Sequence, residues 1–396
     1  MNNKISIVSK TLRIHDNPFL DSDVYIIYID KSEYGPTQLH FLNAILLLHL
    51  HDLRQKNIEP IIVNSLSSVV KFIKQNKDLE FDVYTDYISG RKKFPIDDVT
   101  FISTWSLINW YGKEEMLREW FLPEVLGNHS VFKKYVHKNI RDEFKSQTKK
   151  NKIKSLNINF LSLHEIKKSK KLPLELPQKN LDKWIQNELL KKKHMLSNKW
   201  EKPKTSASIA LSDDLNIIPL INQGSKLSPF VALGILSPLY MYKFFKGETR
   251  SGSSRDQLLF REMFHAMSVL PEFWNDNFGK KYKWKIVNKN KFNDFIKGTT
   301  EFTDINFAMK LLKKEGWIHH LARHVVADYL CRGRLEYHWK YGERWFKHTL
   351  IDHDDCVNRG NWMWLSGTAF SSKQRSFYHY NPDNYIQNLD KRLKIK

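Results

Sequence analysis

Residues 316 to 364 read GWIHHLARHVVADYLCRGRLEYHWKYGERWFKHTLIDHDDCVNRGNWMW, and the interpretation of the whole chain starts from this stretch. It combines five Trp with several His, Arg and Asp. Buried His, Arg and Asp side chains cost free energy unless each of them finds a partner. An ordinary core helix does not need this mixture, so we expect a polar and aromatic group to lie against the stretch.

Length and composition favour a soluble intracellular protein with two domains. The chain has 396 residues, of which 41% are hydrophobic, and this content excludes a disordered chain. Its two Cys, Cys331 and Cys356, are too few for a disulfide framework or a four-thiolate metal cluster, so a reducing compartment is expected. The sequence shows neither an apolar leader nor a run of 18 apolar residues, and we expect no membrane span.

The formal net charge of +21 favours polyanionic partners, with nucleic acid before an anionic membrane surface. Much of this charge is local, because residues 133–204 hold 21 Lys and Arg against 7 Asp and Glu. A Lys-rich solvated linker produces the same net charge without a binding groove. The charge therefore supports a nucleic-acid partner but does not establish one.

The first part of the chain has the pattern of an α/β domain with a doubly wound parallel sheet. Short β-branched runs at residues 5–8, 24–29, 60–63 and 99–104 predict buried strands. Residues 40–56 predict a helix between the second and third of these strands. Short apolar strands that alternate with helices are typical of a parallel sheet, and we assign residues 1–130 to this domain.

Two further regions follow the α/β domain. Residues 131–204 are rich in Lys, Asn, Ser and Pro, as expected of an interdomain connector. Residues 205–396 show long helical periodicities and almost no alternating segments, so they predict an all-α second domain that holds most of the Trp.

His320 and His324 lie four residues apart and therefore share one face of a helix that is predicted to begin after Gly316. One interpretation is a metal-binding pair. The residues between them are Leu-Ala-Arg, so the Glu of the metalloprotease helix is missing and a cation takes its place. We therefore expect no metal, and two His with partners at a helix surface or in a core remain the alternative.

Other polar groups admit both a structural and a binding interpretation. Asp352, Asp354 and Asp355 could cap a helix, or pair with Arg323 and accept hydrogen bonds from a ligand ring. The turn GSKLS at residues 224–228 resembles a diphosphate cradle, although many helices begin with Ser-Pro. Arg261 could reach an anion or pair with Glu262 or Glu301.

The ordered set TLRIHDNPFL (11–20), GSKLSPFVALGILSP (224–238), QLLFREMF (257–264), GWIHHLARHVVADYL (316–330), GERWF (342–346) and LIDHDDCVNRGNWMWLS (350–366) resembles the photolyase/cryptochrome flavoprotein family. The second half matches more closely than the first. WIHHLARH followed by NWMWLS resembles the (6-4) photolyase and animal-cryptochrome branch. The resemblance implies an all-α FAD-binding domain, and it leaves an antenna chromophore uncertain.

The resemblance also implies roles for individual residues. Trp317 would lie beside the flavin cavity, Arg323 and Asp352 would form an ion pair against the isoalloxazine ring, and Asn358 would face flavin N5. An Asn at this last position is typical of photolyases, whereas animal cryptochromes usually have a Cys there and plant cryptochromes have an Asp. The other implied cofactor contacts are Ser225, Lys226, Leu227, Ser228, Gln257, Arg261 and Asp354.

The implied substrate is a pyrimidine lesion in UV-damaged DNA. His320 and His324 match the pair that handles the proton of the lesion in (6-4) enzymes, a task that suits imidazole because its pKa lies near neutrality. Phe260 occupies the position at which the family usually has a Trp that stacks on the lesion. Trp317 is a second residue that would bind the lesion. Electrons would reach the flavin through Trp362, Trp339 and Trp284, for each of which a core aromatic is the plain alternative.

We therefore predict a monomeric, light-dependent DNA photolyase that uses reduced FAD and prefers (6-4) photoproducts to cyclobutane dimers. A cryptochrome-like blue-light photoreceptor, or a flavin redox protein without repair activity, is the alternative. A basic nucleic-acid binder without a flavin is the third possibility.

Overall fold

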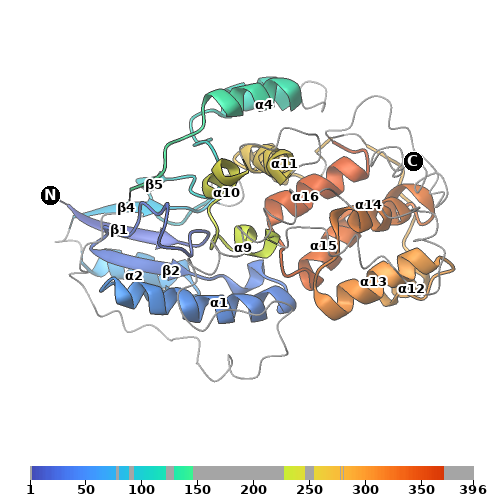
Figure 1. Ribbon diagram of the computed structural model, residues 1–396, viewed down its shortest axis with the longest axis horizontal. Helices are drawn as coiled ribbons and strands as arrows, with labels where there is room; N and C mark the ends of the chain where they lie inside the picture. Colours follow the sequence, from blue (N-terminus) through green and yellow to red (C-terminus); the bar gives the residue numbers. More distant parts are fainter. Residues whose placement is uncertain are drawn as a thin grey trace.

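The computed structural model describes residues 2–76, 80–88, 93–121, 129–145, 227–245, 254–276, 278–279 and 281–369. A parallel five-stranded sheet lies at the N-terminal end of the molecule, and helices make up the rest (Figure 1). Most of the predicted connector at residues 131–204, together with Ser225 and Lys226, lies outside the described residues.

The sheet has the strand order β3-β2-β1-β4-β5, and all of its pairings are parallel. Its strands are β1 (Asn3–Val8), β2 (Val24–Tyr28), β3 (Ile61–Val63), β4 (Phe81–Thr85) and β5 (Val99–Phe101). The four predicted strands are present, with ends shifted by one to three residues. The sequence prediction missed β4, which pairs with both β1 and β5.

Helices cover both faces of the sheet, as a doubly wound fold requires. Ile5 and Ile7 of β1 join a cluster with α2 (Leu66–Gln75), whereas Val8 and alternate residues of β2 join the core that contains α1 (Pro36–Gln55). Side chains alternate between the two faces of a strand, so the two clusters lie on opposite sides. The predicted fold class is confirmed.

Helices dominate the second half of the described chain, again as predicted. They are α9 (Ser228–Ala232), α10 (Pro238–Phe244), α11 (Ser254–Met267), η2 (Pro271–Trp274), α12 (Lys289–Lys297), α13 (Thr303–Glu315), α14 (His320–Asp328), the π-helical η3 (Tyr329–Gly333), α15 (Lys340–Thr349) and α16 (Asp355–Leu365). The short helix η1 (Lys31–Glu33) lies between β2 and α1, and α3 (Glu114–Phe121) and α4 (His129–Lys138) lie between the last strand and α9. The predicted boundary at residue 130 falls within α4.

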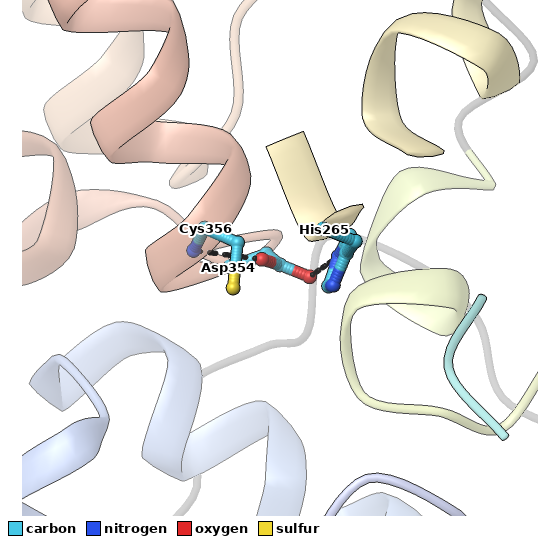
Figure 2. Close-up of side chains that lie close together, drawn as sticks. All are labelled: His265, Asp354 and Cys356. Carbon is cyan, nitrogen blue, oxygen red and sulfur yellow. Dashed lines mark hydrogen bonds and ion pairs between the residues drawn. The ribbon is translucent and has the colours of Figure 1, made fainter. Parts of the chain in front are cut away.

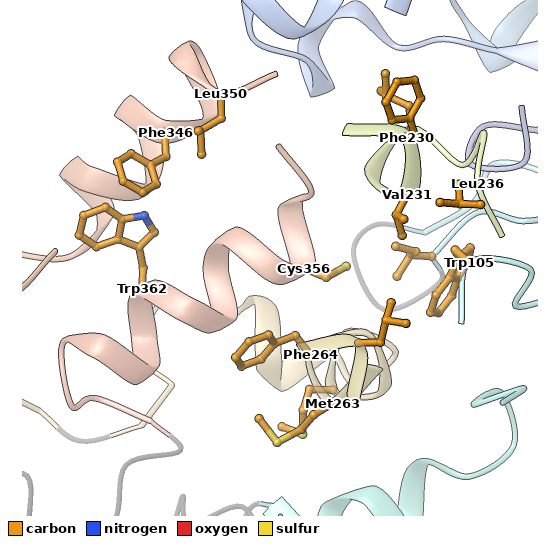
Figure 3. Packing of buried hydrophobic residues seen from close by; sticks show 14 of the residues in the cluster. Trp105, Phe230, Val231, Leu236, Met263, Phe264, Phe346, Leu350, Cys356 and Trp362 are labelled. Atoms are coloured by element: carbon orange, nitrogen blue, oxygen red, sulfur yellow. The ribbon is translucent and has the colours of Figure 1, made fainter. Parts of the chain in front are cut away.

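One continuous core joins the two parts of the molecule. It contains Trp105, which follows β5, as well as Phe230 of α9, Met263 of α11 and Trp362 of α16 (Figure 3). Polar contacts cross the same boundary, because the Arg13 guanidinium donates to the carbonyl of Gly234 at 2.8 Å. This packing fixes α11 and α16 relative to the sheet.

Candidate functional site

A chain of polar contacts connects three segments of the helical part. The Arg323 guanidinium on α14 lies 2.8 Å from Asp352 Oδ2, and the hydroxyl of Ser228 donates to the same oxygen at 2.7 Å. Trp317 Nε1 donates to Ser228 Oγ at 3.2 Å. The ion pair that the resemblance implied is therefore present, and the chain of contacts brings together four of the predicted cofactor residues.

Asp352 provides a test of whether this region suits a flavin. Its Oδ1 atom is buried and has no hydrogen-bond partner among the described residues. An orphaned buried acceptor costs free energy until a donor reaches it, and the imide N–H of an isoalloxazine ring is such a donor. The residues present fit the cofactor that the resemblance implies.

Asn358 gives a second indication of the same kind. It is buried on α16, and its Nδ2 donates to the backbone carbonyl of Glu343 at 2.9 Å. That contact turns the amide so that Oδ1 is left as an acceptor for a further donor. Gln257 is exposed on α11, one turn before Arg261, and Leu227 is buried at the start of α9.

Asp354 begins α16 and also bonds to α11. Its Oδ1 accepts from the backbone N–H groups of Cys356 and Val357, so it caps the helix. Its Oδ2 lies 2.9 Å from His265 Nε2 and 3.5 Å from the Arg261 guanidinium. Burial would raise the pKa of Asp354, but His265 and Arg261 outweigh it and hold this pKa well below its usual range. Asp354 is therefore an anion in the interior.

His265, Asp354 and Cys356 form a buried cluster of side chains that can ligate metals (Figure 2). Their ligand atoms lie within 4.8 Å of one another. Burial raises the pKa of the Cys356 thiol, whereas a metal-bound Cys is a thiolate. Both oxygens of Asp354 already have protein partners, and the Arg261 cation lies beside them. Hydrogen bonds and an ion pair satisfy Asp354, whereas the buried His265 Nδ1 has no hydrogen-bond partner among the described residues.

Sequence reasoning missed His265 and considered Glu262 only as a partner of Arg261, whereas both residues hold α11 against the segment after β5. His265 packs on Trp105 with a ring-centroid distance of 5.0 Å. The Glu262 carboxylate accepts from Leu107 N, Ile108 N and Trp110 Nε1 at 2.7 to 3.2 Å. The spacing of His265 from Arg261 placed both on one helix face, and this was the only available signal.

A row of rings lies on the other side of α16 from the Trp362 side chain. The rings of Phe260 and Trp364 are stacked 6.0 Å apart, and Trp364 contacts His324 at 5.7 Å. His324 contacts His320 at 5.9 Å, and His320 contacts His319 at 4.3 Å. We call Phe260, Trp364, His324, His320 and His319 the aromatic row. Trp362 and Trp364 diverge because successive helical residues are rotated by about 100°.

The His end of the aromatic row favours uncharged imidazoles. Surrounding protein atoms and the Arg323 guanidinium lower the pKa of His320 to about 4, although the side chain still contacts solvent. Burial, followed by the neighbouring His320 and Arg323, lowers the pKa of His319 to about 3. At neutral pH each ring therefore offers one N–H donor and one acceptor.

The three predicted electron-transfer Trp each contact neighbouring aromatic rings. Trp362 is buried and packs on Phe346 of α15 at 5.0 Å. Trp339, which is also buried, directly precedes α15, and its neighbour His338 contacts both Trp339 at 5.2 Å and Trp284 at 5.3 Å. Trp284 is partly exposed. Two of the three Trp are therefore buried and one is partly exposed, and the redox role of these residues remains a prediction.

Comparisons with known proteins find photolyases and cryptochromes. A family model for the FAD-binding domain of DNA photolyase matches residues 254–394. A (6-4) DNA photolyase of Oryza sativa is 34% identical over 215 residues, which are 50% of this chain and 37% of that protein. Cryptochrome-2 of Gallus gallus is 35% identical over 198 residues, covering 44% of this chain and 32% of that protein. The chain thus matches about a third of the length of these relatives.

A structural comparison extends the likeness to the whole fold. The crystal structure of a photolyase from Sulfolobus tokodaii, described as containing two FAD molecules, superposes with a TM-score of 0.66 at 19% identity. The match covers 100% of this chain and 89% of that one. No helix in the described part of the chain is long and apolar enough to cross a membrane. Residues 254–394 therefore match the FAD-binding domain of DNA photolyase, and the chain resembles photolyases and cryptochromes in sequence and in fold.

Proposed function

We propose that this protein is a light-dependent DNA repair enzyme that acts on a pyrimidine lesion, with (6-4) photoproducts preferred to cyclobutane dimers. The aromatic row supports this proposal most directly, because it ends in three His beside the Arg323–Asp352 ion pair. When bound, reduced FAD excited by blue light supplies an electron to the lesion. The protein binds the damaged bases, keeps water away from them and handles the proton.

Each part of the row has a role in this proposal. Phe260 and Trp364 offer the stacking surface for bases that have left the duplex, as enzymes that act on extruded bases require. His320 and His324 lie next to that surface and exchange a proton with the lesion. Arg323, Asp352 and Asn358 hold the flavin ring.

A photoreceptor without repair activity is the second candidate function, and the cryptochrome relatives favour it. Cryptochrome-2 of Gallus gallus is as similar to this chain as the rice photolyase is. Asn358, which is the photolyase choice at its position, supports the repair enzyme instead. Both functions require a bound flavin, but only the repair enzyme restores damaged DNA.

The decisive experiment is repair of a defined lesion. Oligonucleotides that carry one (6-4) photoproduct or one cyclobutane dimer are irradiated with blue light in the presence of the reduced protein, and intact pyrimidines are quantified. We expect restoration of the (6-4) substrate at the higher rate. Restoration of neither lesion would favour the photoreceptor, and a protein without a flavin spectrum after refolding with FAD would contradict both functions.

His324→Ala tests the proton-handling role. Loss of a general acid or base lowers a rate by about 10² to 10⁴-fold, so (6-4) repair should fall by a factor in this range. His348→Ala is the matched control, because His348 is exposed on α15 and stacks on Trp345. Full repair by the His324→Ala variant would show that the assigned role is wrong.

A further inference from the structure

Helix α1 of the sheet part reaches the turn that carries Asp352. This turn, residues 350–354, joins α15 to α16, and α1 packs against α15 (Figure 1). Gln38, in the first turn of α1, is 1% exposed, and its Nε2 donates to the backbone carbonyl of His353 at 2.5 Å. A buried amide of α1 therefore holds the residue that directly follows Asp352.

A backbone hydrogen bond holds the residue that directly precedes Asp352. The N–H of Ile351 donates to the carbonyl of Gly316 at 2.9 Å. A Cβ added to Gly316 would lie 2.8 Å from Thr37 Cγ2 and 2.9 Å from Ile351 Cγ2, so α1, the turn and residue 316 meet closely. Asp352 thus lies between two neighbours whose backbones are anchored.

The side chain of His353 anchors the same turn to two further helices. Its Nε2 lies 2.8 Å from Asp355 Oδ1 at the start of α16. The same oxygen lies 3.6 Å from the Lys347 ammonium of α15. Contacts with α1, α15 and α16 therefore fix the backbone of the turn.

The anchored backbone determines where Asp352 Oδ1 points. Arg323 and Ser228 both contact the other oxygen, Oδ2, and the carboxylate can pivot about that atom. Oδ1 is the buried acceptor without a hydrogen-bond partner among the described residues. A hydrogen bond weakens steeply when donor and acceptor lose their alignment. Oδ1 can therefore bind a ligand donor tightly only if the backbone of Asp352 is held in place.

We propose that Gln38 is a positioning residue for the flavin. By holding the carbonyl of His353, it fixes the backbone of Asp352 and aims Oδ1 at the imide N–H of the isoalloxazine ring. The sheet part of the molecule thereby contributes to cofactor binding through Asp352. This inference rests on the role of Asp352 in the proposed function and adds a residue to it.

The alternative is that Gln38 only stabilises the packing of α1 on the helical part. An FAD analogue methylated at flavin N3 distinguishes the two roles, because it has no imide N–H and gains nothing from an aimed Asp352. A positioning role predicts that loss of the Gln38 amide weakens the binding of FAD more than the binding of the analogue. A packing role predicts equal losses for both.

The test titrates the apoprotein form of the full chain with FAD and with N3-methyl-FAD, and flavin fluorescence gives both dissociation constants. Gln38→Met keeps the length of the side chain and removes its amide. We expect the wild type to bind FAD about 10- to 100-fold more tightly than the analogue, and Gln38→Met to lower this ratio about 3- to 10-fold. Gln55→Met, at the exposed end of the same helix, is the control and should keep the wild-type ratio.

A double mutant tests whether Gln38 acts through Asp352. In the Asp352→Asn background, Gln38→Met should change the ratio no further, because both substitutions remove the same interaction. Circular dichroism checks that each variant is folded. Gln38→Asn, whose amide is too short to reach the carbonyl of His353, takes the place of Gln38→Met if that variant does not fold.

The outcomes separate this inference from the function on which it rests. An unchanged ratio in folded Gln38→Met, together with a lowered ratio in Asp352→Asn, would overturn only the positioning role. Additive effects of the two substitutions would overturn it as well. An unchanged ratio in Asp352→Asn would show that Asp352 does not contact the flavin N–H, so the flavin contact in the proposed function would fail together with the inference.

Discussion

We predict that flavin binding depends most on the buried carboxylate of Asp352. It pairs with Arg323, accepts from Ser228 and keeps one oxygen for a further donor. Hydrogen bonds to charged groups contribute about 1.5 to 3 kcal/mol each, so Asp352→Asn should weaken FAD binding by about one to two orders of magnitude. Titration of the apoprotein with FAD, followed by flavin fluorescence, measures this change. Asp294→Asn on exposed α12 is the control, and unchanged affinity in Asp352→Asn would rule out the contact.

Substitution of Trp362 can distinguish a role in electron transfer from a role in packing. Its ring is buried against Phe346, and a Phe at this position keeps an aromatic core residue. If Trp362 transfers electrons, Trp362→Phe should slow photoreduction of the oxidised flavin but leave repair by already reduced protein unchanged. Absorbance of the flavin under blue light follows the first step, and Trp345→Phe is the control. Equal loss of photoreduction and repair would instead indicate packing.

The resemblance to photolyases and cryptochromes predicted the Arg323–Asp352 pair but not the partners of α11. Glu262 accepts hydrogen bonds from Leu107, Ile108 and Trp110, and His265 packs on Trp105; these partners lie about 150 residues earlier in the chain. Such contacts depend on the tertiary fold and have no local pattern. Glu262 was considered a partner for Arg261, which instead contacts Asp354 and the carbonyl of Trp105.

At the scale of elements, the sequence prediction misplaced one helix end and missed one strand. Gly316 has φ +66° and ends α13, whereas we expected it to precede a helix directly. A residue in the left-handed region is typical of a helix C-terminus. Residues 317–319 therefore lie outside helix, and Trp317 can reach Ser228. Strand β4 was missed because polar Asp82 interrupts a five-residue strand that is otherwise half-buried.

The junction between α11 and the segment after β5 should respond to pH. Burial outweighs three hydrogen-bond donors and raises the pKa of Glu262 to about 7, against an ordinary value of 4.5. The folded protein then binds this proton more tightly than the unfolded chain does. The associated stability is present below pH 4.5 and is lost as the pH rises through 7. It amounts to roughly 3 kcal/mol for a shift of this size.

Glu262→Gln removes this titration. The variant should be less stable than the wild type, because an amide cannot accept from all three donors, and its stability should change less between pH 4.5 and 7. Urea unfolding at a series of pH values measures both effects, with Glu301→Gln on the surface as the control. A wild-type slope that persists in Glu262→Gln would assign the pH dependence to other groups.

On the scale of the whole molecule, the sheet and the helical part share one hydrophobic core. The cluster that contains Val8 and Phe41 also contains Phe264 and Trp362, and Figure 3 shows its rings coming from both parts. Residues that share a close-packed core lose their contacts together when either part opens. We therefore expect the cofactor site to unfold when the interface between the sheet and the helical part opens.

Gly234 lies where that interface is tightest. Its φ is +73°, and a Cβ at this position would lie 1.5 Å from the backbone carbonyl oxygen of Lys10. Gly112 has a similar φ of +78° but no atom within 4 Å of such a Cβ, so it is a matched control. Gly112→Ala should cost only the backbone strain, about 1 to 2 kcal/mol. Gly234→Ala should cost more, because two backbone segments from different parts of the molecule must separate.

The wild type and Gly112→Ala should unfold in one transition, seen alike by Trp fluorescence and by hydrogen exchange of the sheet amides. Gly234→Ala should give two transitions, because the helical part loses its contact with the sheet while each part keeps its own helices or strands. FAD release should accompany the first of them, since Arg261 donates to the carbonyl of Trp105 across this interface at 2.7 Å. A single transition in Gly234→Ala, with a loss equal to that of Gly112→Ala, would show that the interface tolerates the added methyl group.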